Sequence, residues 1–183
     1  MTPALSTALL VGLAALVLLA MWRGWRGLSR RSSAILAELP AEPATDQLGE
    51  ALTDDLPATY VSTTTAGDWL DRLAVHDLGV RSPAVVRVHE AGVAVRRTGA
   101  RDLFVPAAAL LAVERTGGMA GKVVGGQGIV VLRWEAPGPG GTAVAVDTGL
   151  RLRRRSDSTT LTAAVDGLRQ SRPAAPTSEE ESR

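Results

Sequence analysis

A glycine-rich segment, residues 116–128, is the part of the sequence whose composition most suggests phosphate binding. It holds six glycines around Lys122, and backbone N–H groups in such loops can bind anions. A P-loop, however, needs a glycine and a hydroxyl residue where this sequence has Thr116 and Val123. The dinucleotide pattern fails as well, because Val131 stands where its third glycine is required. We interpret the segment as a connection between strands, and an anion site at Lys122 is the alternative.

Arginines gather near the end of the folded part. This group, called the arginine cluster below, consists of Arg151, Arg153, Arg154 and Arg155. Such cations could contact anionic lipid headgroups, each contributing about 1 kcal/mol at a membrane surface. A solvated strand end explains them more simply, because Leu150 and Leu152 alternate with arginines. The candidate binding residues are therefore Lys122, Arg151, Arg153 and Arg154.

Residues that commonly carry catalysis are scarce and scattered. The 183 residues include no cysteine and two histidines, His76 and His89. Neither histidine has Asp, Glu or His nearby at the spacing of a metal site. Asp68 and Asp71 could form a carboxylate pair, but the start of a helix explains them better. Without a His–acid pair to activate a nucleophile, the sequence predicts no enzyme, no metal site and no cofactor.

Charge and aromatic content argue against nucleic-acid binding. The formal net charge is +1, and residues 59–170 hold 14 basic and 10 acidic residues. Affinity for nucleic acids comes largely from neutralised phosphates, which so mild an excess cannot supply. Aromatic residues, which could stack on bases, make up only 3% of the chain. We expect no nucleic-acid partner.

The first element of the chain is an uncharged apolar run at residues 4–22. A helix of that length spans about 28 Å, close to the roughly 30 Å hydrocarbon core of a bilayer. The charged residues that follow it most closely are Arg23, Arg26, Arg30 and Arg31, and none precedes it. Because arginines stay on the cytoplasmic side, we predict an uncleaved transmembrane helix in the plasma membrane with its N-terminus outside. A cleaved secretory signal is the alternative.

Two further segments flank the folded part. Residues 23–58 combine the basic stretch next to the span with an acidic stretch that contains prolines. We interpret the acidic part, residues 32–58, as a solvated linker that keeps the domain away from an anionic leaflet. Residues 171–183 contain prolines and three consecutive glutamates without apolar periodicity, which predicts a disordered tail.

Between them, residues 59–170 consist of short apolar runs separated by glycine and proline, which is typical of an antiparallel β domain. We expect six or seven strands, drawn from the runs at residues 59–65, 84–89, 93–97, 103–105, 112–115, 129–135, 142–147 and 150–153. Residues 66–78 predict a short helix or an ordered loop with Asp68 near its N-cap. Residues 107–110 predict a single helical turn.

One amphipathic helix is expected at residues 157–170, with Ser156 or Asp157 as its cap. Its apolar stripe consists of Leu161, Ala164, Val165 and Leu168. We expect this stripe to cover the strand face that carries Val130, Leu132 and Trp134, with Trp134 in the core. The predicted fold class is α+β, mainly antiparallel β. It is a bent sheet or open barrel with a C-terminal helix, preceded by one transmembrane helix.

This order of elements looks like a pleckstrin-homology-like (PH-like) domain. Six segments carry a closer resemblance: residues 60–64 (YVSTT), 78–81 (LGVR), 104–106 (FVP), 120–123 (AGKV), 133–134 (RW) and 147–151 (DTGLR). In this order behind one span, they resemble an uncharacterised family of membrane-anchored PH-like proteins from high-GC Gram-positive bacteria. Genes of that family often lie among those for pyrimidine biosynthesis. The resemblance covers nearly the whole chain and implies fold and topology, but no activity and no binding residues.

The sequence thus favours a single-pass membrane protein that presents a cytoplasmic PH-like binding or scaffolding domain. Its expected partners are the lipid bilayer, through residues 4–22, and a protein at the membrane whose identity the sequence does not indicate. The alternative function is a sensor of anionic lipid headgroups or nucleotides. Such a sensor would use the glycine-rich segment and the arginine cluster.

Overall fold

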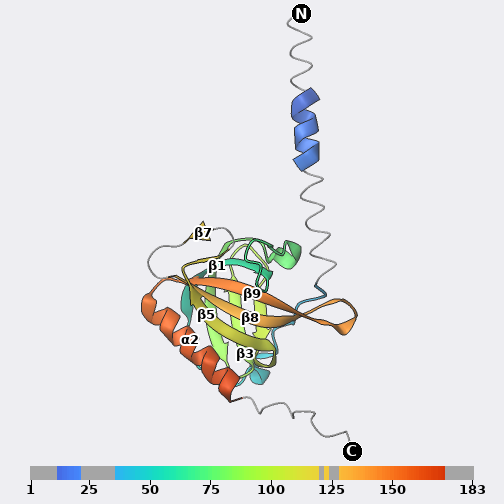
Figure 1. Ribbon diagram of the computed structural model, residues 1–183. Coiled ribbons are helices and arrows are strands. Elements are labelled where there is room, and N and C mark those ends of the chain that lie inside the picture. Colours follow the sequence, from blue (N-terminus) through green and yellow to red (C-terminus); the bar gives the residue numbers. More distant parts are fainter. Residues whose placement is uncertain (1–11, 22–35, 120–121, 124–127, 172–183) are drawn as a thin grey trace, which may run out of the picture.

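The computed structural model describes residues 12–21, 36–119, 122–123 and 128–171 (Figure 1). Residues 12–21 form a helix. Within the described residues, no helix combines the length and the apolar character that crossing a membrane requires. Part of the predicted span at residues 4–22, and nearly all of the predicted tail at residues 171–183, lie outside the described residues.

Seven antiparallel strands form the main sheet, in the order β4-β3-β2-β1-β9-β8-β5 (Figure 1). Their bounds are Leu56–Thr65 (β1), Ser82–His89 (β2), Gly92–Arg97 (β3), Leu103–Pro106 (β4), Leu110–Thr116 (β5), Ile129–Pro137 (β8) and Ala143–Leu152 (β9). A small separate ladder joins β6 (Gly118–Met119) to β7 (Lys122–Val123). Helix α2 (Arg155–Gln170) follows β9. The predicted antiparallel fold with a C-terminal helix is confirmed.

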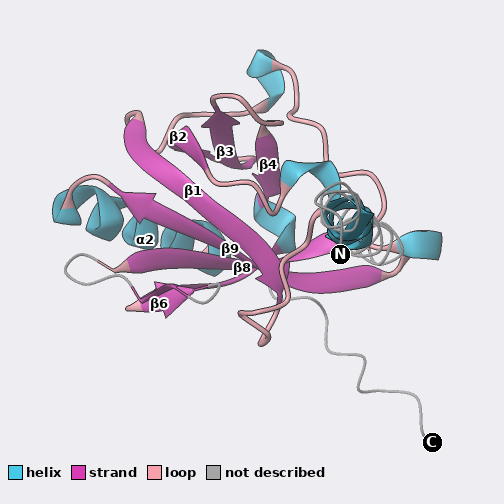
Figure 2. Ribbon diagram, turned by 90° about the horizontal axis from the view of Figure 1, so that it is seen from above, coloured by secondary structure: helices cyan, strands magenta, loops and turns pink. Residues whose placement is uncertain are grey.

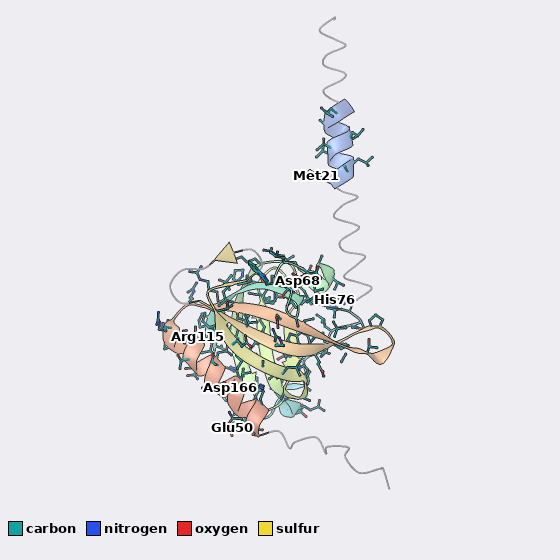
Figure 3. All side chains as sticks on the ribbon, in the orientation of Figure 1. Met21, Glu50, Asp68, His76, Arg115 and Asp166 are labelled. Carbon is teal, nitrogen blue, oxygen red and sulfur yellow. The ribbon has the colours of Figure 1, made fainter. Side chains whose placement is uncertain are left out.

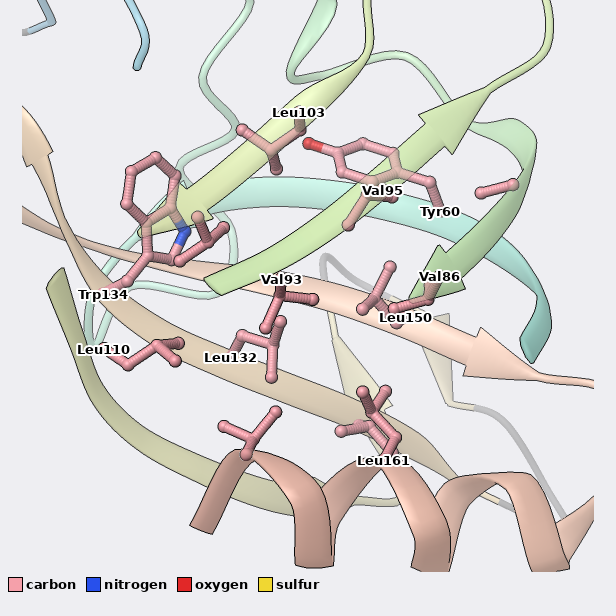
Figure 4. Close-up of a cluster of buried hydrophobic side chains, with 14 of the residues drawn as sticks. Tyr60, Val86, Val93, Val95, Leu103, Leu110, Leu132, Trp134, Leu150 and Leu161 are labelled. Carbon is pink, nitrogen blue, oxygen red and sulfur yellow. The ribbon is translucent and has the colours of Figure 1, made fainter. Parts of the chain in front are cut away.

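Helix α2 covers one side of the bent sheet, where it packs on β5, β9 and β2 (Figure 2). Its buried residues are Ser158, Leu161, Val165 and Leu168, so the predicted apolar stripe faces the sheet. Leu161 points from the helix into the cluster of buried side chains (Figure 4). The predicted cap is wrong, because Arg154 is the N-cap residue and makes no side-chain cap bond. Ser156 and Asp157 lie inside the first turn instead.

Strands β1 and β9 are longer than predicted, and the other five strands of the main sheet also exceed their predicted lengths, by one to three residues. Strand β1 begins at Leu56, three residues earlier than expected, because Leu56 to Tyr60 pair with β2. Strand β9 continues without a break from Ala143 to Leu152, although Gly149 suggested an interruption. This continuity places the end of β9 next to β1 and directly before α2.

The largest buried side chains are Trp134 and Tyr60, which lie among aliphatic residues (Figure 4). Trp134 is 0% exposed, which confirms its predicted place in the core. The buried N–H group of its indole also has a hydrogen-bond partner, which the sequence did not indicate. The Nε1–H group donates a hydrogen bond of 2.9 Å to Thr148 Oγ1.

That bond begins a chain of buried hydrogen bonds. The Thr148 and Thr63 hydroxyls are 2.8 Å apart, and the Thr63 and Tyr60 hydroxyls are 2.6 Å apart. The chain ends where the Tyr60 hydroxyl donates to the Leu78 carbonyl oxygen at 2.9 Å. Because an indole N–H only donates and a carbonyl only accepts, each hydroxyl in the chain donates toward the Leu78 carbonyl oxygen. Burial raises the pKa of the Tyr60 phenol far above its ordinary value, so the phenol stays protonated.

Arg97 lies against the same tyrosine and is only 7% exposed. Its guanidinium is 3.8 Å from the centre of the Tyr60 ring. Its N–H groups donate to Ser82 Oγ and to the carbonyl oxygens of Arg101, Asp77 and Val80, at 2.7–3.1 Å. Burial lowers the pKa of Arg97, and the neighbouring Tyr60 opposes that effect. Arg97 thereby ties β3 to the connection between β1 and β2.

That connection, the β1–β2 loop (residues 66–81), is ordered but contains no α-helix. The ordered-loop alternative is therefore the correct one. A single 3-10 turn, η2 (Val75–Asp77), holds His76 and Asp77 at φ of 53° and 59°. Leu73 and Leu78 are buried, and backbone hydrogen bonds join both to Thr63 in β1.

Residues 36–55, called the N-terminal arm below, pack on the domain. Leu36 and Leu39 belong to the main core, and Leu48 packs against Ala94 and Phe104. Backbone hydrogen bonds join the arm to β2 and to its turn into β3, including Leu52 to Val88. The interpretation of residues 32–58 as a solvated linker therefore does not hold for the arm, because its leucines are buried by the sheet.

Candidate binding surface

The arginine cluster lies where β9 ends and α2 begins. Arg151 faces outward on β9 opposite Thr59, while Leu150 and Leu152 point into the core. Arg153 follows in the turn, where its backbone N–H donates to the Pro57 carbonyl oxygen at 3.1 Å. Arg154 is the N-cap residue of α2, and Arg155 is its first residue. The structure thus holds three of the predicted binding residues on one short, well-anchored stretch.

All four side chains of the cluster are exposed. In the part of the chain that the structure describes, none of them forms an ion pair or a side-chain hydrogen bond. The ion pairs found there include Arg87–Asp55, Arg96–Glu42, Arg133–Asp147 and Arg169–Asp166. The cluster therefore presents four solvated cations whose donors can meet an anionic ligand.

The start of α2 adds to the positive potential of this surface. No side chain caps the first N–H groups of the helix, and the helix dipole places a partial positive charge there. Asp157, in the first turn, is the acidic residue on the same stretch. The arrangement can hold anionic groups by charge and hydrogen bonding.

Lys122, the fourth predicted binding residue, lies on a different element. It belongs to β7, where its backbone pairs with Met119 of β6. Its side chain lies outside the described part of the chain, as do residues 120–121 and 124–127 of the glycine-rich segment. The described residues of the segment include a small ladder between β5 and β8, a feature that the sequence did not predict.

The two histidines lie apart and do not form a metal site. His76 Nε2 is 2.9 Å from the Ala37 carbonyl oxygen, and its Nδ1 is 3.2 Å from Arg101 Nη1. His89 ends β2, and its Nδ1 is buried without a partner. Among the described residues, no group of three His, Asp or Glu side chains could hold a metal ion.

Asp68 and Asp71 stabilise the β1–β2 loop and do not form a carboxylate pair. Asp68 Oδ1 accepts the backbone N–H of Leu70 at 3.1 Å. Asp71 Oδ2 accepts the Thr65 hydroxyl at 2.9 Å. The two carboxylates thus stabilise the turn itself.

A hollow of about 440 Å³ lies between the N-terminal arm and the outer faces of β2 and β3. Its basic side chains are already engaged by the arm, because Arg87 pairs with Asp55 at 2.9 Å and Arg96 pairs with Glu42 at 3.0 Å. Acidic residues that the sequence suggested were solvated thus bind to the domain. Among the described residues, the arginine cluster has no such counterion.

One surface feature escaped the sequence analysis. Trp69 and Leu70, placed there in a short helix or ordered loop, are 51% and 65% exposed in the β1–β2 loop. The sequence could have indicated this exposure, because a Trp-Leu pair enclosed by aspartates after Gly67 lacks the spacing of an amphipathic helix.

Comparison with known families agrees with this architecture. Residues 36–166, well over half of the chain, match the model of a family described as bacterial PH domain-like. The chain belongs to the bacterial PH domain-like family. The matched residues include the whole N-terminal arm, so the arm lies within the family region of the chain. No curated protein matches the sequence.

Membership in this family supports a general role for the domain. PH-like domains are generally binding modules without catalytic activity. The match concerns the PH-like region alone. Membrane anchoring, the bacterial group and the pyrimidine-gene neighbourhood, expected from the finer resemblance, stay predictions.

Proposed function

We propose that this chain is a single-pass membrane protein whose PH-like domain is a binding or scaffolding module at the inner face of the plasma membrane. The observation that carries the proposal is the uncharged apolar run at residues 4–22, followed closely by Arg23, Arg26, Arg30 and Arg31. The buried N-terminal arm supports it further. An anchor that leads into an arm packed on the domain would hold the domain close to the bilayer.

In this proposal the N-terminus is outside and the domain is cytoplasmic, because arginines are retained on the cytoplasmic side. Alkaline phosphatase fused after Arg183 tests the orientation, since that enzyme is active only outside the cytoplasm. We expect an inactive fusion and an unprocessed N-terminus. An active fusion would show that the orientation is the opposite one. A mature chain that begins after Ala20 would show that the segment is a cleaved signal and not an anchor.

The binding partner in this proposal is a protein at the same membrane. The family of the domain supports a binding role. Co-purification from detergent-solubilised membranes with the full chain as bait is the direct test. A partner that also binds a variant with all four arginines of the cluster changed to glutamine would lie on another surface.

A second candidate function is recognition of anionic lipid headgroups or nucleotides by the arginine cluster. The observation in its favour is that these exposed cations have no carboxylate partner among the described residues. Binding would be strongly salt-dependent, because it depends on exposed charges. The full chain in neutral detergent should bind anionic vesicles at low salt, and Arg153→Gln with Arg154→Gln should weaken that binding. Arg96→Gln is the control, and equal vesicle binding by this chain and by the Arg153→Gln, Arg154→Gln chain would show that the cluster is not the binding surface.

A further inference from the structure

The exposed pair Trp69 and Leu70 lies on an ordered turn of the β1–β2 loop. Both ends of the turn are fixed, because Thr65 N–H donates to the Asp71 carbonyl oxygen at 3.1 Å and Leu73 N–H donates to the Thr63 carbonyl oxygen at 3.0 Å. Leu73, only a few residues further on, is buried. The structure thus presents two large apolar side chains to the surroundings on a rigid support. A single exposed apolar residue is common, but an adjacent Trp-Leu pair on an anchored turn favours an apolar contact.

The chain enters the domain at this same loop. His76 in the β1–β2 loop is bonded through its Nε2 to the Ala37 carbonyl oxygen at 2.9 Å, and Leu36 beside it is 3% exposed. Asp68 and His76 lie at one end of the domain, and Glu50 lies at the opposite end (Figure 3). The entry point of the N-terminal arm and the exposed pair therefore share one end of the domain.

The length of chain before the arm limits how far this end can lie from a membrane. Thirteen residues separate Trp22, the last residue of the apolar run, from Leu36. Even fully extended, they reach less than about 50 Å. If residues 4–22 span the bilayer, the end of the domain that carries the β1–β2 loop is the end tethered nearest to it.

We infer that Trp69 and Leu70 insert into the interfacial region of the same bilayer that the proposed anchor spans, so that the domain docks on the membrane in one orientation. This inference rests on the proposed membrane anchoring. A tryptophan ring is suited to the headgroup region, with its apolar body among lipids and its N–H toward water. Loop residues 66–81 hold Asp68, Asp71 and Asp77 against Arg72 and Arg81, so charge does not draw the loop to anionic lipid. The contact is therefore apolar and insensitive to salt, unlike binding by the arginine cluster.

The absence of cysteine allows a direct test in the full chain. Leu70→Cys, labelled with a polarity-sensitive fluorophore, is compared with Glu50→Cys at the opposite end. The labelled chains are reconstituted in phosphatidylcholine vesicles with and without nitroxide-bearing lipid. We expect a blue-shifted emission at position 70 that the nitroxide quenches and high salt does not change. The label at position 50 should emit as in water.

Flotation of the same vesicles separates the inference from the proposal on which it rests. A chain that fails to float with the vesicles contradicts the membrane anchor, and the inference then fails with it. A chain that floats, but whose label at position 70 is as water-exposed as the label at position 50, overturns the docking inference alone. Circular dichroism of both labelled chains checks that they are folded, and position 70 is exposed enough to accept the change.

Discussion

Arg97 and the arginine cluster show two opposite uses of the same side chain. Arg97 is buried, lies over the Tyr60 ring and donates to one hydroxyl and three carbonyl oxygens. The arginines of the cluster are exposed and have no side-chain partner among the described residues. A buried arginine is tolerated when its donors are satisfied, whereas an exposed one keeps its donors for water or a ligand. Arg97 therefore stabilises the fold, whereas the arginine cluster is available for binding.

The interior polar region extends beyond Arg97. It includes the hydrogen-bond chain from Trp134 through Thr148 and Thr63 to Tyr60. These groups join β8, β9 and β1, and Arg97 joins them to β3. We therefore expect substitutions in this region to change stability, and substitutions in the cluster to leave stability almost unchanged.

The largest expected effect is that of Trp134→Ala. The change removes the largest buried side chain and leaves Thr148 without its donor, so it should lower the free energy of unfolding by about 3 to 5 kcal/mol. Denaturant titration of the full chain in detergent micelles measures the loss. The matched control is Trp69→Ala, where a half-exposed indole is removed and the change should be below about 0.5 kcal/mol. Equal losses for the two variants would contradict the assignment of Trp134 to the core.

A smaller loss is expected for Arg97→Ala, at about 2 to 4 kcal/mol, because several buried acceptors lose their donors. Arg97→Lys should not restore stability, since an ammonium cannot reproduce the planar donor arrangement over Tyr60. The neighbouring Arg96 is the control, because its ion pair with Glu42 lies at the surface. Arg96→Ala should cost less than about 1 kcal/mol in the same titration. If Arg96→Ala costs as much as Arg97→Ala, burial does not distinguish the two arginines.

Tyr60 gives the interior region a pH dependence at the alkaline end. Burial raises the pKa of its phenol in the folded state above the value of about 10 in the unfolded chain. This contribution to stability is therefore complete below pH 10 and is lost as pH rises through the folded-state pKa. Tyr60 is the single tyrosine of the sequence, so tyrosinate absorbance reports it alone. Tyrosinate should appear only as the chain unfolds, and ionisation of the folded chain near pH 10 would show that the phenol is accessible.

The smallest effect on stability belongs to the cluster. Arg153→Ala should change the free energy of unfolding by less than about 0.5 kcal/mol, because its side chain is exposed and has no ion-pair partner among the described residues. The same denaturant titration checks this expectation. A loss as large as that of Arg97→Ala would mean that Arg153 is structural, and the contrast between the two regions would then disappear.

Much of the fold could be predicted from local pattern. The alternation of Val86 and Val88 with Arg87 and His89 indicated the β2–β3 hairpin, and the stripe of Leu161, Val165 and Leu168 indicated α2. Both signals reflect which side of an element is buried, and they need no knowledge of distant residues. Trp134 followed from the same alternation along β8.

The features that were missed depend on contacts between distant segments. The N-terminal arm was taken for a linker because its acidic residues and prolines outweigh Leu36, Leu39 and Leu48. Its place on the domain is fixed by contacts with β2 and β3 that no local pattern reveals. Arg97 could have been noticed, since it shares a strand face with Val93 and Val95. Its hydrogen-bond partners lie in other loops and could not be predicted.

For the candidate binding residues, the sequence predicted that they lie together, but it did not predict whether their charges are free to bind a ligand. Arg151, Arg153 and Arg154 come together because they are neighbours in the chain, and any β-strand followed by a helix would keep them close. Whether their charges are neutralised depends on acidic residues from elsewhere. In the structure, two acidic residues of the arm, Asp55 and Glu42, pair with Arg87 and Arg96.

Membrane retention of the full chain tests the central claim, that residues 4–22 anchor this PH-like domain. Cells expressing the full chain are lysed, and the membranes are washed with high salt, which removes proteins held by surface charge alone. We predict that the chain stays with the membranes. We also predict that Leu13→Arg with Leu16→Arg releases it, because each arginine at the centre of a span costs about 2.5 to 3.5 kcal/mol. Leu52→Arg, at an exposed position of the N-terminal arm, is the control and should remain bound. A full chain released by the salt wash, or a Leu13→Arg, Leu16→Arg chain retained as firmly as the control, would contradict the membrane anchor.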